Sequence, residues 1–179
     1  QRGRTDLSRR CHDDGVKSLA GRTIKLVGPT GEANQLTFLL RGLVWCRADS
    51  DDALFNQIAA TLATGNTPLV GTEVVEQLAA AMLPKAVRDS VVEDEYPENH
   101  PNLACVLFSV PSEARQSLRQ QLAGREGEIL SVIEPNADGG YPLYRLVKEK
   151  VISVNTASAG GDAALMMLGN SLLQFTPLW

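Results

Sequence analysis

The feature that most constrains this chain is the alternation of short apolar runs with amphipathic segments between Thr23 and Ile133. We expect strands at residues 24–27, 36–40, 42–46, 67–70, 90–92, 103–110 and 129–133, because these runs are short, rich in β-branched residues and bounded by turn residues. Strands that alternate with helices are joined by right-handed crossovers and form a largely parallel sheet with helices on both faces. The sequence therefore predicts a Rossmann-like α/β domain over residues 22–142.

The expected helices begin at residues whose side chains accept hydrogen bonds from the free amide groups of a helix start. These residues are Ser50, Thr72 and Ser112. The first helix also carries Asp51 and Asp52 in its first turn, where negative charge suits the helix dipole. The expected ends of the three helices are Gly65, Pro84 and Gly124.

The two ends of the chain have different patterns from the middle. Residues 1–21 are charged and irregular, so we expect a polar linker there. Two apolar runs at 143–147 and 151–154 flank three charged residues, and they predict a β-hairpin-like extension, with a short helix in the first run as the alternative. No initiating Met is present, and we expect the chain to be a piece of something longer.

Composition limits the compartment and the partners. The hydrophobic fraction of 44% and the charged fraction of 21% are typical of soluble globular domains. A net charge of -4 has the wrong sign for a nucleic-acid-binding domain, and no apolar run is long enough to span a membrane. Three widely spaced cysteines argue against a disulfide framework and fit a reducing compartment. We therefore expect a cytoplasmic protein with no nucleic-acid partner and no membrane span.

Residues that would carry chemistry are few. Gly28-Pro-Thr-Gly31 lacks the third glycine of a dinucleotide fingerprint and precedes no helix, so it predicts a tight turn. Cys46 and Cys105 fall inside the two most hydrophobic strands, where burial keeps a thiol protonated. Cys11 stands beside a histidine, but a zinc site needs about four convergent ligands. The sequence therefore predicts no catalytic, cofactor-binding or metal-binding residue.

The tail after residue 143 is the best candidate for a functional surface. Its small residues would let a partner backbone approach closely, and the flanking runs are more aliphatic than a solvent-exposed hairpin should be. We expect residues 143–169 to dock on another domain or subunit, with folding back onto the same domain as the alternative. The expected contact residues are Ser153, Asn155, Thr156, Gly160, Gly161 and Asp162.

Three local motifs give the chain a family resemblance. They are GPTGEAN at 28–34, ATLATGN at 60–66 and SVNTASAGGDAALM at 153–166. Together they resemble the C-terminal domain of the longer forms of proline utilization A, a bifunctional flavoenzyme that oxidises proline to glutamate. The resemblance covers residues 22–169 in order, and the apolar residues 170–179 extend beyond it with no clear role.

The resemblance implies a degenerate aldehyde dehydrogenase nucleotide-binding domain. Leu62-Ala-Thr-Gly-Asn66 is similar to a helix end of aldehyde dehydrogenases, but their Gly-Gln-x-Cys nucleophile context and their Gly-Ser cofactor turn are absent. The implied role is a non-catalytic lid over a substrate-channelling path and an assembly element for the aldehyde dehydrogenase domain. FAD and NAD would then bind to other domains, and the partners would be catalytic domains of the same polypeptide or of a dimer mate. The rival reading is a free-standing Rossmann-type nucleotide-binding enzyme or ligand sensor.

Overall fold

The computed structural model describes residues 2–75, 78 and 83–155 of the chain, and these residues divide between two compact units. Unit 1 comprises Gln1–Ala20 and Leu39–Lys148. Unit 2 comprises Gly21–Phe38 and Glu149–Trp179, of which the structure describes the part up to Asn155. Each unit has its own sheet.

The sheet of unit 1 has five parallel strands in the order β5-β4-β3-β6-β7. Their bounds are Leu43–Ala48 for β3, Thr67–Gly71 for β4, Val92–Asp94 for β5, Leu103–Ser109 for β6 and Ser131–Ile133 for β7. Within this sheet, the first strand in the sequence, β3, is central. Strands β4 and β5 follow toward one edge, and β6 and β7 then lie on the other side of β3. This is a doubly wound order, and it confirms the predicted Rossmann-like α/β fold.

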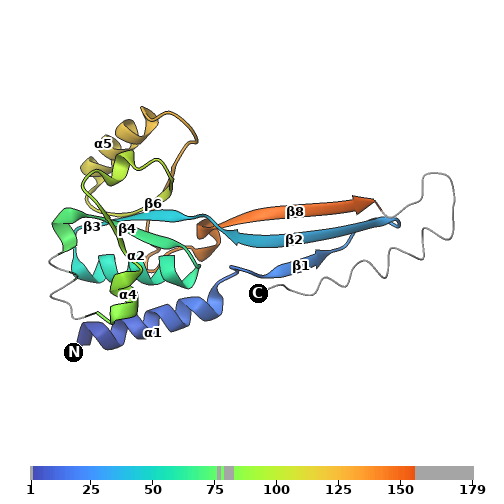
Figure 1. The fold of residues 1–179 in the computed structure, drawn as a ribbon, viewed down its shortest axis with the longest axis horizontal. Coiled ribbons are helices and arrows are strands. Elements are labelled where there is room, and N and C mark those ends of the chain that lie inside the picture. Colours follow the sequence, from blue (N-terminus) through green and yellow to red (C-terminus); the bar gives the residue numbers. More distant parts are fainter. Residues whose placement is uncertain (1, 76–77, 79–82, 156–179) are drawn as a thin grey trace. The chain divides into compact units, whose positions relative to one another are not determined.

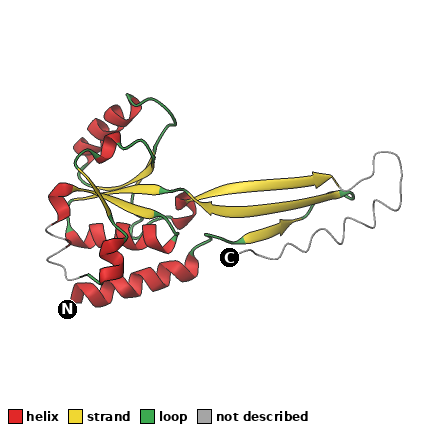
Figure 2. Ribbon diagram, viewed as in Figure 1, coloured by secondary structure: helices red, strands yellow, loops and turns green. Residues whose placement is uncertain are grey.

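Helices cover both faces of this sheet, as the sequence predicts. In Figures 1 and 2, α5 lies on one face, while α2, α1 and α4 lie on the other. The α-helices are α1 (Arg2–Lys17), α2 (Asp51–Ala63), α4 (Lys85–Asp89) and α5 (Ser112–Ala123). Short 3-10 helices occupy Thr72–Val74 (η1), Pro97–Asn99 (η2) and Leu143–Leu146 (η3).

The core of unit 1 lies on both sides of the central strands. Leu107 and Ile133 pack with Val44 beneath α2, while Phe108 and Leu118 pack under α5. All five side chains are buried. Apolar residues therefore alternate between two covered faces, and this is why the central strands appear in the sequence as nearly continuous apolar runs.

The predicted helix starts have mixed outcomes. Ser50 caps α2 by accepting a hydrogen bond from the amide of Ala53 at 3.4 Å, and Gly65 adopts a left-handed φ of +71° after the helix. The prediction for α5 is wrong, because Pro111 is its N-cap and Ser112 is already helical. Most of the helix expected after Thr72 lies outside the described residues.

The expected linker at the start of the chain contains a helix instead. Helix α1 belongs to unit 1, and Cys11 packs against the core cluster that includes Leu54 and Ile58 of α2. Apolar residues are sparse in this segment, so its helical periodicity is weak in the sequence. Packing against α2 supplies the stabilisation that the pattern does not reveal.

Unit 2 is built on a three-stranded sheet with the order β1-β2-β8. The bounds are Thr23–Leu26 for β1, Glu32–Leu40 for β2 and Val147–Asn155 for β8. Strands β1 and β2 are antiparallel, and Thr23 pairs with Thr37. Figure 1 shows β2 and β8 running in opposite directions.

The predicted hairpin within residues 143–154 is therefore wrong. Its first half is the 3-10 helix η3, which was the stated alternative, and its second half extends into β8 and pairs with β2. The charged residues Lys148, Glu149 and Lys150 continue the strand, because none of them is a residue that favours a two-residue hairpin turn.

Candidate functional site

The sheet of unit 2 exposes an unusual number of large apolar side chains. They are Ile24 and Leu26 of β1, Val27 beside it, and Val151, Ile152 and Val154 of β8. The described residues of unit 2 include no helix that could cover them. Clustered exposed apolar residues mark interaction surfaces in soluble proteins. We call this set of strands the unit 2 sheet.

A cavity of about 380 Å³ lies on the unit 2 sheet, and residues of all three strands line it. Its lining is Lys25, Leu26, Glu32, Ala33, Asn34, Gln35, Ile152 and Val154. Strands β1 and β8 form the edges of the sheet among the described residues. Edge strands carry backbone groups that a further strand can pair with, so this sheet offers both an apolar cavity and free edges.

The predicted contact residues are only partly within the described chain. Ser153 and Asn155 lie on β8, and both are exposed. Thr156, Gly160, Gly161 and Asp162 lie outside the described residues. The structure therefore places the first two predicted contacts on the unit 2 sheet.

A second candidate site lies in unit 1, at the carboxyl ends of β3, β6 and β7. This hollow of about 400 Å³ is lined by Asp49, Phe108, Ser109, Val110, Pro111, Arg115, Glu134 and Pro135. The strand order reverses between β3 and β6, and open α/β sheets bind their ligands at such a point. We call it the switch-point cavity.

The turns beside the switch-point cavity are poorly suited to phosphate. The β3–α2 turn carries Asp49, Asp51 and Asp52, and the Ser50 side chain already bonds an amide of the helix start. At the β6–α5 turn stands Pro111, which has no N–H to offer. Anions bind at such turns through free amide groups and a positive potential. Both turns therefore disfavour the pyrophosphate of a dinucleotide.

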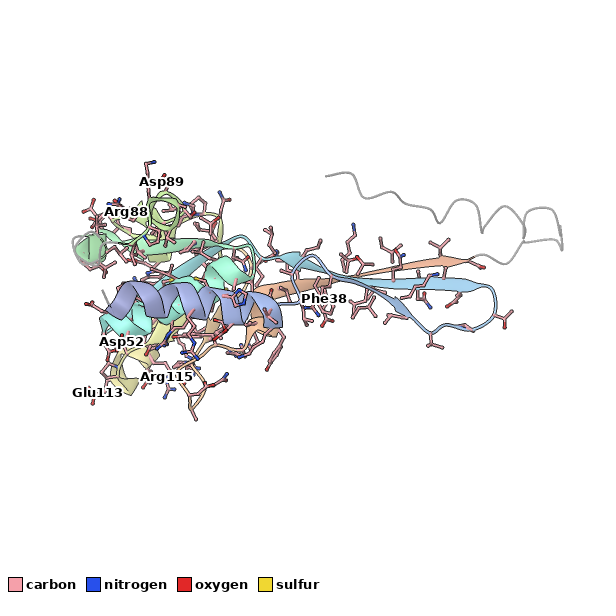
Figure 3. The ribbon with its side chains drawn as sticks, turned by 90° about the horizontal axis from the view of Figure 1, so that it is seen from below. Phe38, Asp52, Arg88, Asp89, Glu113 and Arg115 are labelled. Carbon is pink, nitrogen blue, oxygen red and sulfur yellow. The ribbon has the colours of Figure 1, made fainter. Side chains whose placement is uncertain are left out.

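An ion-pair cluster forms one wall of the switch-point cavity. Arg115 Nη1 lies 2.7 Å from Glu134 Oε2, and Arg119 Nη2 lies 3.4 Å from Glu134 Oε1. Figure 3 labels Arg115 on α5, together with Glu113 of the same helix. The sequence gives no local signal of the link between these arginines and Glu134, because Glu134 lies outside α5, beyond β7.

Behind the cavity lies a buried polar network. Gln57 Nε2 donates hydrogen bonds to the Arg47 carbonyl oxygen at 3.0 Å and to the Tyr141 hydroxyl at 2.8 Å. Burial is the main cause that raises the pKa of Tyr141 to about 12. The phenol therefore stays protonated at neutral pH, and its hydrogen bond with Gln57 links Tyr141 to the middle of α2.

The thiols occupy the places that the sequence predicts. Burial raises the pKa of Cys46 to about 12 and that of Cys105 to about 11. Neither thiol is a nucleophile at neutral pH, because the reactive species is the thiolate. Burial and the nearby Asp14 also raise the pKa of Cys11. No group of three or more potential metal ligands gathers within the part of the chain that the structure describes.

Of the helices that the structure describes, none has the length and apolar character needed to cross a membrane.

No protein-family model matches the chain. Comparison with individual proteins is more informative. The chain is 35% identical over 169 residues to the bifunctional protein PutA of Escherichia coli K12, covering 93% of the chain and 13% of that protein. It is 32% identical over 163 residues to PutA of Rhizobium meliloti, covering 87% of the chain and 13% of the relative.

Solved structures agree with this comparison. A crystal structure of a Bradyrhizobium japonicum proline utilization A variant matches with a TM-score of 0.55 and 27% identity, covering 75% of this chain and 15% of that one. An NAD-dependent benzaldehyde dehydrogenase from Corynebacterium glutamicum shares the fold, with a TM-score of 0.53 and 14% identity over 74% of this chain and 32% of the other. The chain spans only about 13% of the PutA relatives, and it is homologous to one segment of these bifunctional proteins, with a fold similar to that of aldehyde dehydrogenases.

Proposed function

We propose that this chain is a non-catalytic domain of a bifunctional proline-catabolic enzyme, in which it covers the path of the intermediate and helps to assemble the aldehyde dehydrogenase domain. The enzyme would combine an FAD-dependent proline dehydrogenase with an NAD-dependent L-glutamate γ-semialdehyde dehydrogenase in the cytoplasm. The unit 2 sheet carries this proposal, because it exposes apolar side chains that a partner surface would bury. The partner is a catalytic domain of the same polypeptide or of a dimer mate.

The chemistry of the described side chains supports a covering role. The thiols of Cys46 and Cys105 are buried and protonated, and both turns at the switch-point cavity disfavour phosphate. A cover over a water-filled path needs shape and a closely packed edge, and it needs no nucleophile or cofactor. FAD and NAD would accordingly be held by the other domains.

The proposed contacts begin on β8 and continue past its end. Ser153 and Asn155 lie on the exposed strand, and Thr156 and Asp162 belong to the segment that follows. Gly160 and Gly161 would let a partner backbone approach closely, because glycine has no Cβ. Substituting either glycine with a bulky residue should therefore weaken the contact.

A chimera tests this proposal directly. The matching segment of E. coli PutA is replaced by this chain, and the coupled conversion of proline to glutamate is measured beside dye-linked proline oxidation. We expect the intact chimera to support coupled turnover. The double substitution Ile152→Asp and Val154→Asp should lower coupled turnover by about tenfold or more, because both side chains lie on the cavity face of the unit 2 sheet and two charges would have to be buried at the contact.

The matched control is Ile129→Asp, which places the same charge on an apolar residue of unit 1 that is 99% exposed. This control should leave coupled turnover unchanged, and proline oxidation should survive in every variant. Equal coupled turnover in the intact chimera, in the double variant and in a chimera lacking residues 147–169 would contradict the proposal.

The alternative function is that of a nucleotide-binding enzyme or sensor, which the position of the switch-point cavity favours. Calorimetric titration of the chain with NAD and with ATP separates the two functions. The acidic β3–α2 turn and Pro111 lead us to expect no binding of either nucleotide. A dissociation constant below about 100 µM, or about -5.5 kcal/mol, would instead favour the nucleotide-binding function.

A further inference from the structure

The switch-point cavity is lined by charges of both signs: the exposed carboxylate of Asp49 and the Arg115–Glu134 ion pair. Among the described residues, no ion pair reaches the carboxylate of Asp49, although this residue lines the cavity. Arg115 lines the same cavity and uses one guanidinium nitrogen in its hydrogen bond to Glu134. Because a guanidinium group carries five N–H donors, Arg115 can still donate to a second carboxylate.

The remaining lining is largely apolar. Phe108 contributes an aromatic ring at the end of β6, and Val110, Pro111 and Pro135 contribute aliphatic surface. Ser109 adds one hydroxyl group. Small-molecule sites have this composition, in which an apolar wall is combined with a few polar groups that fix the orientation of the ligand. A volume of about 400 Å³ is within the range of such sites.

The charge pattern restricts the class of ligand. A phosphate-bearing ligand would meet the carboxylate of Asp49, in a turn that is followed by Asp51 and Asp52, and it would meet Pro111, which has no N–H, at the other turn. A simple anion would meet the carboxylates of Asp49 and Glu134 beside the single guanidinium of Arg115, and a simple cation would make no use of the remaining N–H groups of Arg115. A ligand that carries an ammonium and a carboxylate beside an apolar group satisfies Asp49, Arg115 and the apolar wall together.

We propose that the switch-point cavity binds a free α-amino acid with an apolar side chain, whose ammonium group pairs with Asp49 and whose carboxylate accepts hydrogen bonds from Arg115. The apolar side chain lies against Phe108 and the two prolines. The site is independent of the docking role proposed for the unit 2 sheet, because all of its residues belong to unit 1.

Solution NMR of the full chain tests this site with L-valine as the probe. We expect saturable shifts in the amide resonances of Ser109, Val110 and Arg115. N-acetyl-L-valine lacks the ammonium group, and L-valine methyl ester lacks the carboxylate, so each should bind at least about tenfold more weakly. Adenosine and AMP, added separately, represent ligands of the nucleotide class.

Two variants with matched controls identify the charged partners. Asp49→Asn and Arg115→Gln should each weaken L-valine binding by about tenfold or more. Asp52→Asn and Arg88→Gln remove the same charges at exposed residues outside the lining, and they should leave binding unchanged. Spectra of the free variants report whether the fold is retained.

The outcomes are distinct. The site is supported if L-valine binds to the intact chain, if neither blocked analogue binds to it, and if L-valine fails to bind to either cavity variant. No shift at the highest soluble concentration of L-valine overturns it, and so do equal shifts with L-valine and its blocked analogues. Shifts at the cavity with adenosine but not with L-valine overturn it in favour of a nucleoside ligand.

Discussion

The two units of this chain bury their apolar residues in different ways. In unit 1, strands and helices cover one another, so that Leu107 of β6 is 0% exposed. In unit 2, β8 is paired within a sheet, yet its Val151 remains 57% exposed. Unit 1 therefore supplies its own hydrophobic stabilisation, whereas the unit 2 sheet has apolar surface available to a partner. The following predictions test this difference.

The largest effect should come from removing a core side chain of unit 1. Leu107→Ala should lower the free energy of unfolding by about 3 kcal/mol, because it removes buried methyl groups and leaves a cavity. Val151→Ala on β8 should change it by less than about 0.5 kcal/mol, since much of that side chain is already in water. Urea unfolding followed by circular dichroism measures both, and equal losses would show that β8 is as buried in solution as β6.

This difference also explains what the sequence could predict. The strands β3 and β6 are buried on both faces, so their apolar runs identify them without ambiguity. Strand β8 has an equally clear apolar pattern, but its partner β2 lies more than a hundred residues earlier, in a part of the sequence that carries no signal of the pairing. Local patterns identify elements, whereas the choice of pairing partner depends on the tertiary fold.

Asn66 should give the second largest effect. Its Oδ1 accepts hydrogen bonds from the amides of Arg41 and Gly42 at 2.7 and 2.9 Å, and its Nδ2 donates to the Leu146 carbonyl at 2.8 Å. Arg41 and Gly42 follow β2, and Leu146 precedes β8, so one buried side chain of unit 1 ties together two segments that are about a hundred residues apart in the sequence.

Asn66→Ala should therefore lower the free energy of unfolding by about 2 kcal/mol, because buried backbone groups lose their partners. Hydrogen exchange should speed up at the amides of Arg41 and Gly42. The exposed Asn102 serves as the control, and Asn102→Ala should have little effect on stability. Unchanged exchange at the two amides would show that water replaces the amide side chain without cost.

The candidate sites were harder to predict than the fold. The motif ending at Asn66 is recognisable in the sequence, but its role depends on carbonyl and amide groups that are remote along the chain. The switch-point cavity combines Asp49, Arg115 and Glu134 from separate elements, and each of them alone resembles an ordinary surface charge. Such sites are defined by strand order, which the sequence does not state.

Alkaline pH should destabilise unit 1 through its buried thiols. The folded state raises the pKa of Cys46 to about 12 and of Cys105 to about 11, from an ordinary value of 9.0, so the folded protein keeps protons that the unfolded chain releases. The associated stability is fully present below about pH 9 and is lost as pH rises toward the folded pKa values. The free energy of unfolding should fall by about 1 kcal/mol for each thiol between about pH 9 and about pH 10.

Denaturant midpoints across this range measure the loss, and the Cys105→Ala variant should show a shallower decline than the intact chain. At neutral pH, Cys11 should react with a thiol reagent first, because it is only partly buried. Rapid labelling of Cys46 or Cys105 in the folded protein would contradict the burial of these strands.

The smallest effect should come from the ion pair at the cavity wall. Arg115 and Glu134 are 36% and 40% exposed at their side chains, so water screens their attraction, and Arg115→Gln should cost about 0.5 kcal/mol of unfolding free energy. The loss should shrink as salt is added, because ions screen exposed charges. Lys85→Gln breaks a more exposed pair with Asp89 and should cost still less. A loss of several kcal/mol at Arg115 would show that this wall is part of the core of unit 1.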